Sequence, residues 1–252
     1  MAGTSVRVVH ERALTRITID RAERLNSLTT RDLLELASAV DESDDGITKV
    51  VVLTGAGRAF CSGADLSEGV DASTVGAAQK LVETIVRVRP VVVAAINGPA
   101  AGVGASIALA CDLTLAARSA FLLTPFLRLG LVPDGGATYS LVSRAGTARA
   151  ARIALGGERL TASDAAAWGL VGEVVEDGEL EARVDEVVSG LLDAPVDAIF
   201  ETKALLRGAD LAGVKAAGQA ELDSQSRLLA TPEFARARTG FLAKSPVSFR
   251  DQ

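Results

Sequence analysis

The stretch that decides the fold is Asn97-Gly98-Pro99-Ala100-Ala101-Gly102-Val103-Gly104-Ala105-Ser106. An apolar, β-branched run at 91–96 precedes it, and a run of small apolar residues at 107–110 follows it. This order predicts a buried strand, a tight glycine-containing turn and a buried helix. The first N–H groups of such a helix have no intrahelical partner and lie at the positive end of its dipole. The turn can therefore hold an anion or a developing oxyanion.

The composition limits the class of protein. The chain has 252 residues, of which 48% are hydrophobic, and its formal net charge is −6. About one or two domains are expected at this length, and the hydrophobic content is sufficient for a large core. The negative charge argues against binding of a nucleic-acid phosphate backbone as the main function.

Hydrophobic periodicity predicts strands alternating with helices up to residue 175 and helices alone after it. The expected strands lie at 6–9, 14–19, 49–54, 91–96, 113–116, 121–123 and 171–175. Besides the helix that follows the opening turn, the expected helices lie at 29–43, 75–88, 137–155 (interrupted near Gly146), 161–169, 179–192, 196–206, 211–229 and 232–242. This pattern predicts an α/β core with a helical C-terminal part.

The cysteines and the chain ends indicate the compartment. Cys61 and Cys111 are too few for a disulfide framework and fit a reducing environment. Residues 1–5 contain no apolar signal region, and the last residues carry no peroxisomal tripeptide. The apolar segment 100–117 contains Asp112, so we interpret it as a buried helix and strand. We expect a cytoplasmic protein without a membrane partner.

Metal and dinucleotide motifs are missing from the sequence. His10 is the only histidine, and its place in the N-terminal strand pattern favours a surface position. One histidine and two distant cysteines supply too few ligands for a metal site. The third glycine of the dinucleotide fingerprint is replaced by Phe60 after Gly55-Ala56-Gly57, and by Ile107 after Gly102-Val103-Gly104. We therefore expect neither a metal nor a nicotinamide cofactor.

Phe60-Cys61-Ser62-Gly63-Ala64-Asp65-Leu66 is a second turn of small residues. In one interpretation, Asp65 is the N-cap of a helix that starts there. In the other, the N–H of Ala64 points toward the first turn. Two converging backbone N–H groups would form an oxyanion hole.

Pro133-Asp134-Gly135-Gly136 also has two interpretations. These residue types are common in plain turns. Alternatively, a rigid turn projects the Asp134 carboxylate into a pocket with few other polar groups. Burial there would raise its pKa toward that of a useful general base.

Taken in order, the motifs resemble the crotonase (enoyl-CoA hydratase/isomerase) superfamily over nearly the whole chain. The motifs that carry the resemblance are Leu25-Asn26-Ser27-Leu28, Val52-Leu53-Thr54-Gly55, residues 59–66, Ala94-Ala95-Ile96-Asn97-Gly98, Cys111-Asp112-Leu113, residues 130–136, Ala166-Ala167-Trp168-Gly169-Leu170-Val171 and Phe241-Leu242-Ala243-Lys244. A single motif of this kind is weak evidence, whereas all of them in register are strong evidence.

The resemblance implies a spiral of ββα turns at 1–195 that carries an acyl-CoA site. It also implies a C-terminal helical region at 196–252 that forms a trimer, often doubled to a hexamer, and covers the CoA. The substrate would be an acyl-CoA thioester, so CoA is part of the substrate and no separate cofactor is expected. The thioester oxygen would lie between the N–H groups of Ala64 and Val103.

The resemblance also assigns residues to substrate binding. The residues expected at the CoA and acyl groups are Arg24, Leu25, Ser62, Gly63, Asp65, Leu66, Gly102 and Phe126. Phe241 and Lys244 match positions that reach the CoA of a neighbouring subunit in this family. Ala22 replaces the proline that commonly precedes the Leu-Asn motif.

Departures from the family pattern favour one reaction. Hydratases of this family carry two glutamates, where this chain has Ser106 and Phe126. Asp134 matches the carboxylate of the Δ3,Δ2-enoyl-CoA isomerase branch, which predicts an isomerase with Asp134 as the acid and base. Two alternatives stay open. One is a hydratase or an isomerase of ring-derived acyl-CoA, and the other is an acyl-CoA-binding protein without turnover.

Overall fold

The computed structural model describes residues 5–245 and 247–250. Its main sheet has six strands in the order β1-β2-β3-β4-β6-β9. β1 and β2 pair antiparallel, and every later pair in this sheet is parallel. The strands are β1 (Val6–Glu11), β2 (Leu14–Ile19), β3 (Val50–Gly55), β4 (Val91–Ile96), β6 (Leu113–Ala117) and β9 (Glu173–Val175).

A small second sheet lies beside the main one, in the order β5-β7-β8. Its strands are β5 (Ala100–Ala101), β7 (Phe121–Leu123) and β8 (Leu160–Thr161). The α-helices are α1 (Thr30–Glu42), α2 (Ala72–Arg87), α3 (Val103–Ala110), α4 (Ala137–Ala145), α5 (Thr147–Gly156), α6 (Ala162–Ala167), α7 (Leu180–Asp193), α8 (Val196–Leu229) and α9 (Pro232–Leu242). Two short 3-10 helices are η1 (Ala22–Arg24) and η2 (Phe126–Leu129).

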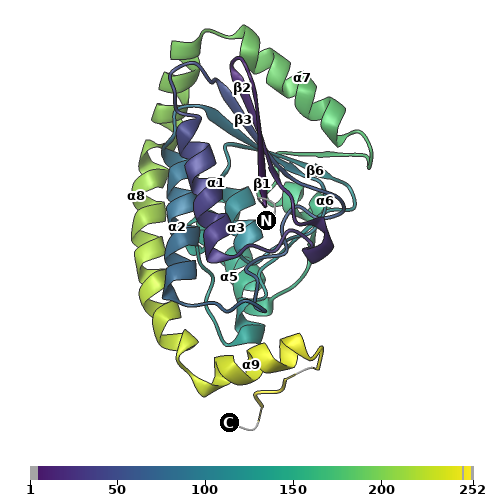
Figure 1. The fold of residues 1–252 in the computed structure, drawn as a ribbon, viewed down its shortest axis with the longest axis vertical. Helices are drawn as coiled ribbons and strands as arrows, with labels where there is room; N and C mark the ends of the chain where they lie inside the picture. Colours follow the sequence, from purple (N-terminus) through teal and green to yellow (C-terminus); the bar gives the residue numbers. More distant parts are fainter. Residues whose placement is uncertain (1–4, 246, 251–252) are drawn as a thin grey trace.

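The helices cover the main sheet in layers. Figure 1 shows α1 and α2 beside the sheet, α8 running along the outer side of α2, and α9 crossing the lower end of the molecule. α7 packs on β3, β4 and β6. β3 and β4 are almost wholly buried, as expected of parallel strands with helices on both faces. This arrangement confirms the predicted α/β core with C-terminal helices.

Most predicted elements are confirmed, with ends displaced by a few residues. β4, β7 and α9 begin and end as expected, and Gly146 separates α4 from α5. Thr29 caps α1: its Oγ1 accepts from Asp32 N at 3.2 Å, and the Asp32 carboxylate accepts from Thr29 N at 2.9 Å.

The prediction of two helices at 196–206 and 211–229 is wrong. α8 is one helix of 34 residues that passes through Gly208 without a break. A glycine inside a helix costs only about 1 kcal/mol, which packing can offset. Arg207 and Asp210, one on each side of Gly208, form an ion pair of 2.8 Å along the helix. The predicted boundary between residues 195 and 196 falls just before α8, and the division into two regions stays a prediction.

No helix among the described residues is both long enough and apolar enough to cross a membrane.

The start of α3 packs directly on the second turn, and this contact generates a stability prediction. A Cβ atom added to Gly104 would lie 2.3 Å from the carbonyl oxygen of Cys61, so Gly104→Ala forces two backbones apart. We expect a loss of about 1–3 kcal/mol in the free energy of unfolding, measured by urea denaturation.

Gly76→Ala in α2 is the matched control, because no atom lies within 4 Å of the added Cβ. It should raise the free energy of unfolding by roughly 0.5–1 kcal/mol. Equal effects of the two substitutions would contradict the packing account.

Candidate active site

Two turns approach each other closely at the end of the main sheet. Cys61 N donates to Pro99 O at 3.1 Å, and Ala101 N donates to Cys61 O at 2.8 Å. Gly63 and Gly102 also lie where the turns are in contact, since a Cβ on Gly63 would be 3.0 Å from Ala101 O and one on Gly102 would be 3.7 Å from Gly63 Cα. Both glycines have positive φ, 107° and 54°, which only glycine adopts at little cost.

The N–H groups of Ala64 and Val103 lie on these two turns. Leu28 donates to Gly63 O and accepts from Asp65 N, both at 2.9 Å, so the N–H of Ala64 between them points away from Leu28. Val103 is the first residue of α3, and its N–H has no intrahelical acceptor. Within residues 5–245 and 247–250, neither N–H donates to another protein group. Their role as an oxyanion hole stays a prediction.

The loop after β2 lies against the second turn. Ser62 N donates to Leu25 O at 3.0 Å, and Ser62 Oγ donates to Arg24 O at 3.4 Å. Leu25 and Asn26 have positive φ of 52° and 57°, and the buried Asn26 amide holds the loop by donating to Ala59 O at 2.7 Å. The structure thus brings Arg24, Leu25 and Ser62 together, and their contact with CoA stays a prediction.

Asp65 is part of a buried ionic network rather than a helix cap. No helix begins there, because α2 starts at Ala72, so the N-cap interpretation is wrong. Its carboxylate accepts from Arg21 at 3.1 Å and from Ser67 N at 3.0 Å. Burial raises the pKa of Asp65, but the hydrogen bonds from Ser67 and the Arg21 charge outweigh it and lower the pKa.

Arg21 was not singled out in the sequence. Its guanidinium also donates to Asp32 at 3.2 Å and to Ser27 O at 2.7 Å, so it joins the η1 loop, α1 and the second turn. Its place between β2 and η1 gave no signal, since its acidic partners Asp32, Asp65 and Glu68 lie 11 to 47 positions away.

α9 packs against the end of the second turn, at Leu66, and against η2. Arg238 of α9 donates to Leu66 O at 2.8 Å, and Phe234 packs with Phe126 and Leu131 in a small apolar cluster. The ring of Phe126 also approaches within 3.9 Å of a Cβ placed on Gly102. Leu66 and Phe126 are therefore close to the turns and are also part of the local packing.

Phe241 and Lys244 lie at the end of α9. Phe241 is 61% exposed, and Lys244 is exposed with a positive φ of 53°. In the part of the chain that the structure describes, the Lys244 side chain makes no hydrogen bond or ion pair. Their predicted contact with the CoA of a neighbouring subunit stays a prediction.

Asp134 is buried on the turn before α4. Its Oδ2 accepts one long hydrogen bond, 3.4 Å, from Gln225, and among the described residues nothing donates to its Oδ1. Burial, together with the nearby negative charge of Glu221, raises the pKa of Asp134 to about 7. A carboxyl group with such a pKa can both accept and return a proton near neutral pH.

Ser106 links Asp134 to the first turn. Its Oγ donates to the carbonyl oxygen of Asp134 at 2.9 Å and lies 3.4 Å from Gly102 O. A Cβ on Gly135 would lie 3.3 Å from Ser106 Cβ, so the turn that carries Asp134 packs on α3 at Ser106. The Ser106 hydroxyl therefore joins the backbone of the Asp134 turn to α3.

Glu221 and Gln225 were also not singled out in the sequence. Both are buried on α8 and contact the Asp134 turn. They continue a buried face that includes Val214 and Gly218, with spacings of four and three residues. That helical spacing is a signal that would have identified them as buried polar residues.

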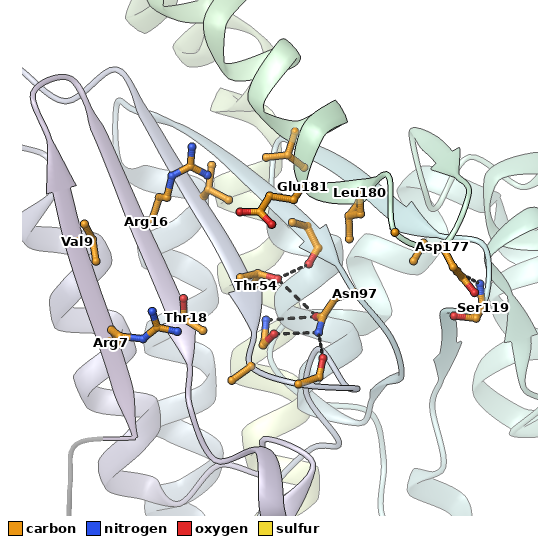
Figure 2. Close-up of a pocket in the computed structure, with 18 of the residues that line it drawn as sticks. Arg7, Val9, Arg16, Thr18, Thr54, Asn97, Ser119, Asp177, Leu180 and Glu181 are labelled. Atoms are coloured by element: carbon orange, nitrogen blue, oxygen red, sulfur yellow. Dashed lines mark hydrogen bonds between the residues drawn. The ribbon is translucent and has the colours of Figure 1, made fainter.

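A cavity of about 670 Å³ lies elsewhere, between α7 and the face of the sheet formed by β1 to β4. Figure 2 shows that its wall includes Arg16, Thr54 and Asn97. The Asn97 amide is already bound to Gly55 O at 2.8 Å, and Arg16 to Asp185 at 2.7 Å. None of the residues predicted for catalysis or CoA binding lines this cavity, so its size gives no support for a role in the predicted reaction.

Other nucleophiles are poorly suited to catalysis. Burial raises the pKa of both thiols, Cys61 and Cys111, to about 12. His10 lies in an exposed strand position, with its Nδ1 3.1 Å from Thr15 Oγ1, which confirms the expected surface location. Over the described ranges, no group of three or more His, Cys, Asp or Glu side chains is placed to hold a metal ion.

The fold and the paired turns are those of an α/β protein with a parallel sheet, and comparison with known proteins shows its family. The family model for enoyl-CoA hydratase/isomerase matches residues 10–252. A probable enoyl-CoA hydratase of Rhodobacter capsulatus is 36% identical, with 99% of each chain covered. A 1,2-epoxyphenylacetyl-CoA isomerase of Escherichia coli is 34% identical, with 95% of each chain covered.

A solved structure is also similar. The crystal structure of an enoyl-CoA hydratase from Mycobacterium avium subsp. paratuberculosis matches with a TM-score of 0.92 and 40% identity, covering 98% of this chain and 99% of the other. The chain belongs to the enoyl-CoA hydratase/isomerase family, and it is an acyl-CoA enzyme of the crotonase superfamily.

The Arg21 network generates a second prediction. Arg21→Gln leaves Asp32 and Asp65 buried without their cation, so we expect a loss of about 3–5 kcal/mol in the free energy of unfolding at neutral pH. The pKa of Asp65 is lowered in the folded protein, so this stabilisation is lost as pH falls through that pKa. Urea denaturation at neutral and acidic pH measures both effects.

Arg31→Gln is the control, because Arg31 forms an ion pair with Glu35 on the exposed surface of α1. It should change the free energy of unfolding by about 0.5 kcal/mol or less. A loss of similar size in both variants would show that the buried network is not the cause.

Proposed function

We propose that the chain is a Δ3,Δ2-enoyl-CoA isomerase with Asp134 as its single acid and base. The ionised carboxylate removes a proton from C2 of a 3-enoyl-CoA, and the electron pair moves into a dienolate. The N–H groups of Ala64 and Val103 hold the negative thioester oxygen of this intermediate. The protonated Asp134 then gives the proton to C4, the double bond becomes C2=C3, and the carboxylate is regenerated.

One observation carries this proposal: Asp134 is a buried carboxyl whose pKa is raised to about 7, and Ser106 fixes it to the turn of Gly102. Ser106 and Phe126 occupy the places where hydratases of this family carry glutamates. A water-adding enzyme needs groups that orient water and carry its proton, and these two side chains are a hydroxyl donating to a backbone carbonyl and an apolar ring. Proton transfer within one acyl chain needs only the one carboxyl group.

A second candidate is an isomerase of ring-derived acyl-CoA, supported by the similarity to the Escherichia coli 1,2-epoxyphenylacetyl-CoA isomerase. The same oxyanion hole and carboxyl group serve both reactions. Assays of 3-hexenoyl-CoA isomerisation, crotonyl-CoA hydration and conversion of an epoxidised aryl-acyl-CoA separate the candidates. Tight acyl-CoA binding without any conversion, and without C2-proton exchange in deuterated water, would instead support a binding protein without turnover.

Asp134→Asn should reduce kcat/KM for 3-hexenoyl-CoA by about 10²–10⁴-fold, because the amide cannot accept the C2 proton. Binding of a saturated acyl-CoA, measured by calorimetry, should persist because the turns that contact the thioester are unchanged. Asp223→Asn, an exposed acid on α8, is the control and should retain full activity. Full activity of Asp134→Asn would exclude this residue as the base.

We also propose that the chain assembles as a trimer or a hexamer in the cytoplasm. Apolar side chains on the C-terminal helices support the assembly: Leu205 and Leu206 on α8 are 84% and 72% exposed, and Phe241 on α9 is 61% exposed. Adjacent exposed apolar groups, such as Leu205 and Leu206 on α8, mark candidate interaction surfaces. A monomer in light scattering at micromolar concentration would contradict the proposal.

A further inference from the structure

Two carboxyl groups lie on opposite sides of the Gly135–Gly136 turn, and only one of them is well supplied with hydrogen-bond donors. Glu221 of α8 is 4% exposed. Its Oε2 accepts from Gly136 N at 2.6 Å, and its Oε1 accepts from Thr138 N at 2.8 Å and Thr138 Oγ1 at 2.6 Å. Asp134 has one donor, the Gln225 amide at 3.4 Å.

This difference in hydrogen bonding indicates which of the two carboxyl groups is ionised and which one holds the proton. Three short hydrogen bonds at the start of α4, where the helix dipole is positive, stabilise the ionised form of Glu221. Burial raises the pKa of Glu221 above its ordinary value, and the hydrogen bonds from Thr138 and Gly136 lower it only in part. Asp134 lacks such support and faces the negative charge of Glu221. In a pair of neighbouring carboxyl groups with unequal surroundings, the less supported one holds the proton.

We propose that Glu221 is a positioning residue for Asp134. It anchors the turn that carries Asp134 to the start of α4, and it keeps a fixed negative charge behind the Asp134 carboxyl so that Asp134 takes up and returns the proton. This inference rests on the proposed function of Asp134, and it goes further by assigning a role to the long C-terminal helix.

Within residues 5–245 and 247–250, no other charged group explains the raised pKa of Asp134. α8 supplies Glu221 and the neutral Gln225, α3 supplies Ser106, and α2 supplies Val82 next to Gly135. Among the described residues, Glu221 is the charged group that acts on Asp134. Gln225 is itself fixed, since its Oε1 accepts from Val132 N at 3.2 Å.

The direct test is a titration of the Asp134 carboxyl in the full chain, without substrate. Carbon-13 NMR of aspartate-labelled protein follows the carboxyl signal, and Asp134→Asn assigns it. The wild-type midpoint is expected near 7, from the raised pKa of Asp134. In Glu221→Gln the midpoint should fall by about half a pH unit or more, because the negative charge is removed. Asp223→Asn removes an exposed charge from the same helix and should leave the midpoint unchanged.

Kinetics supply the second readout. The base must be ionised in the free enzyme, so kcat/KM for 3-hexenoyl-CoA rises with pH through the pKa of Asp134. Glu221→Gln should move this rise to lower pH by the same amount as the NMR midpoint. A residue with a merely structural role would lower the activity at every pH without moving the rise.

Wild-type protein labelled in glutamate keeps the inference testable if Glu221→Gln does not fold. Glu221 should stay ionised while Asp134 titrates, and titration of Glu221 near neutral pH with a constantly ionised Asp134 would overturn the inference. An unchanged Asp134 midpoint in folded Glu221→Gln would also overturn it. Full activity of Asp134→Asn would instead refute the proposed function, and the NMR titration would still report whether Glu221 sets the state of Asp134.

Discussion

The close approach of two backbone turns determines the rest of this structure. Hydrogen bonds join Cys61 to Pro99 and Ala101, and Gly104 at the start of α3 lies against the Cys61 carbonyl with no room for a side chain. The contact leaves the N–H groups of Ala64 and Val103 without protein acceptors within the described ranges. The small residues at 97–106 are therefore required by contact between the two backbones as much as by any substrate.

The second constraint is the buried acid Asp134, whose turn is held by the long helix α8. Ser106 fixes the backbone of Asp134 to α3, while Glu221 and Gln225 reach it from α8. α8 thus completes a site whose other parts come from earlier in the chain, up to the turn at Asp134. α9 also contacts this region, because Arg238 donates a hydrogen bond to Leu66 O. The long helix α8 therefore holds the turn that carries Asp134, in addition to its packing on α2.

The sequence predicted the parts of this protein that depend on local pattern. Strand β4, the turn at Gly102 and the capped helix α1 follow from periodicity and from residue types with strong local preferences. The continuity of α8 was missed because Gly208 is a local signal that tertiary packing overrides. The network of Arg21 was missed because ion pairs between distant residues leave no periodic trace. Asp134 was predicted as the acid and base, and this role stays a prediction. Its charged neighbour Glu221 lies 87 positions away, and only the fold brings the two together.

The central claim is that one buried carboxyl moves a proton along the acyl chain beside the two turns. The most direct measurement is a single turnover of 3-hexenoyl-CoA carrying deuterium at C2, with the product analysed for deuterium at C4. The account predicts that part of the label appears at C4 with the wild-type chain and that neither loss nor transfer of label occurs with Asp134→Asn. Transfer of label by Asp134→Asn at the wild-type rate would contradict it.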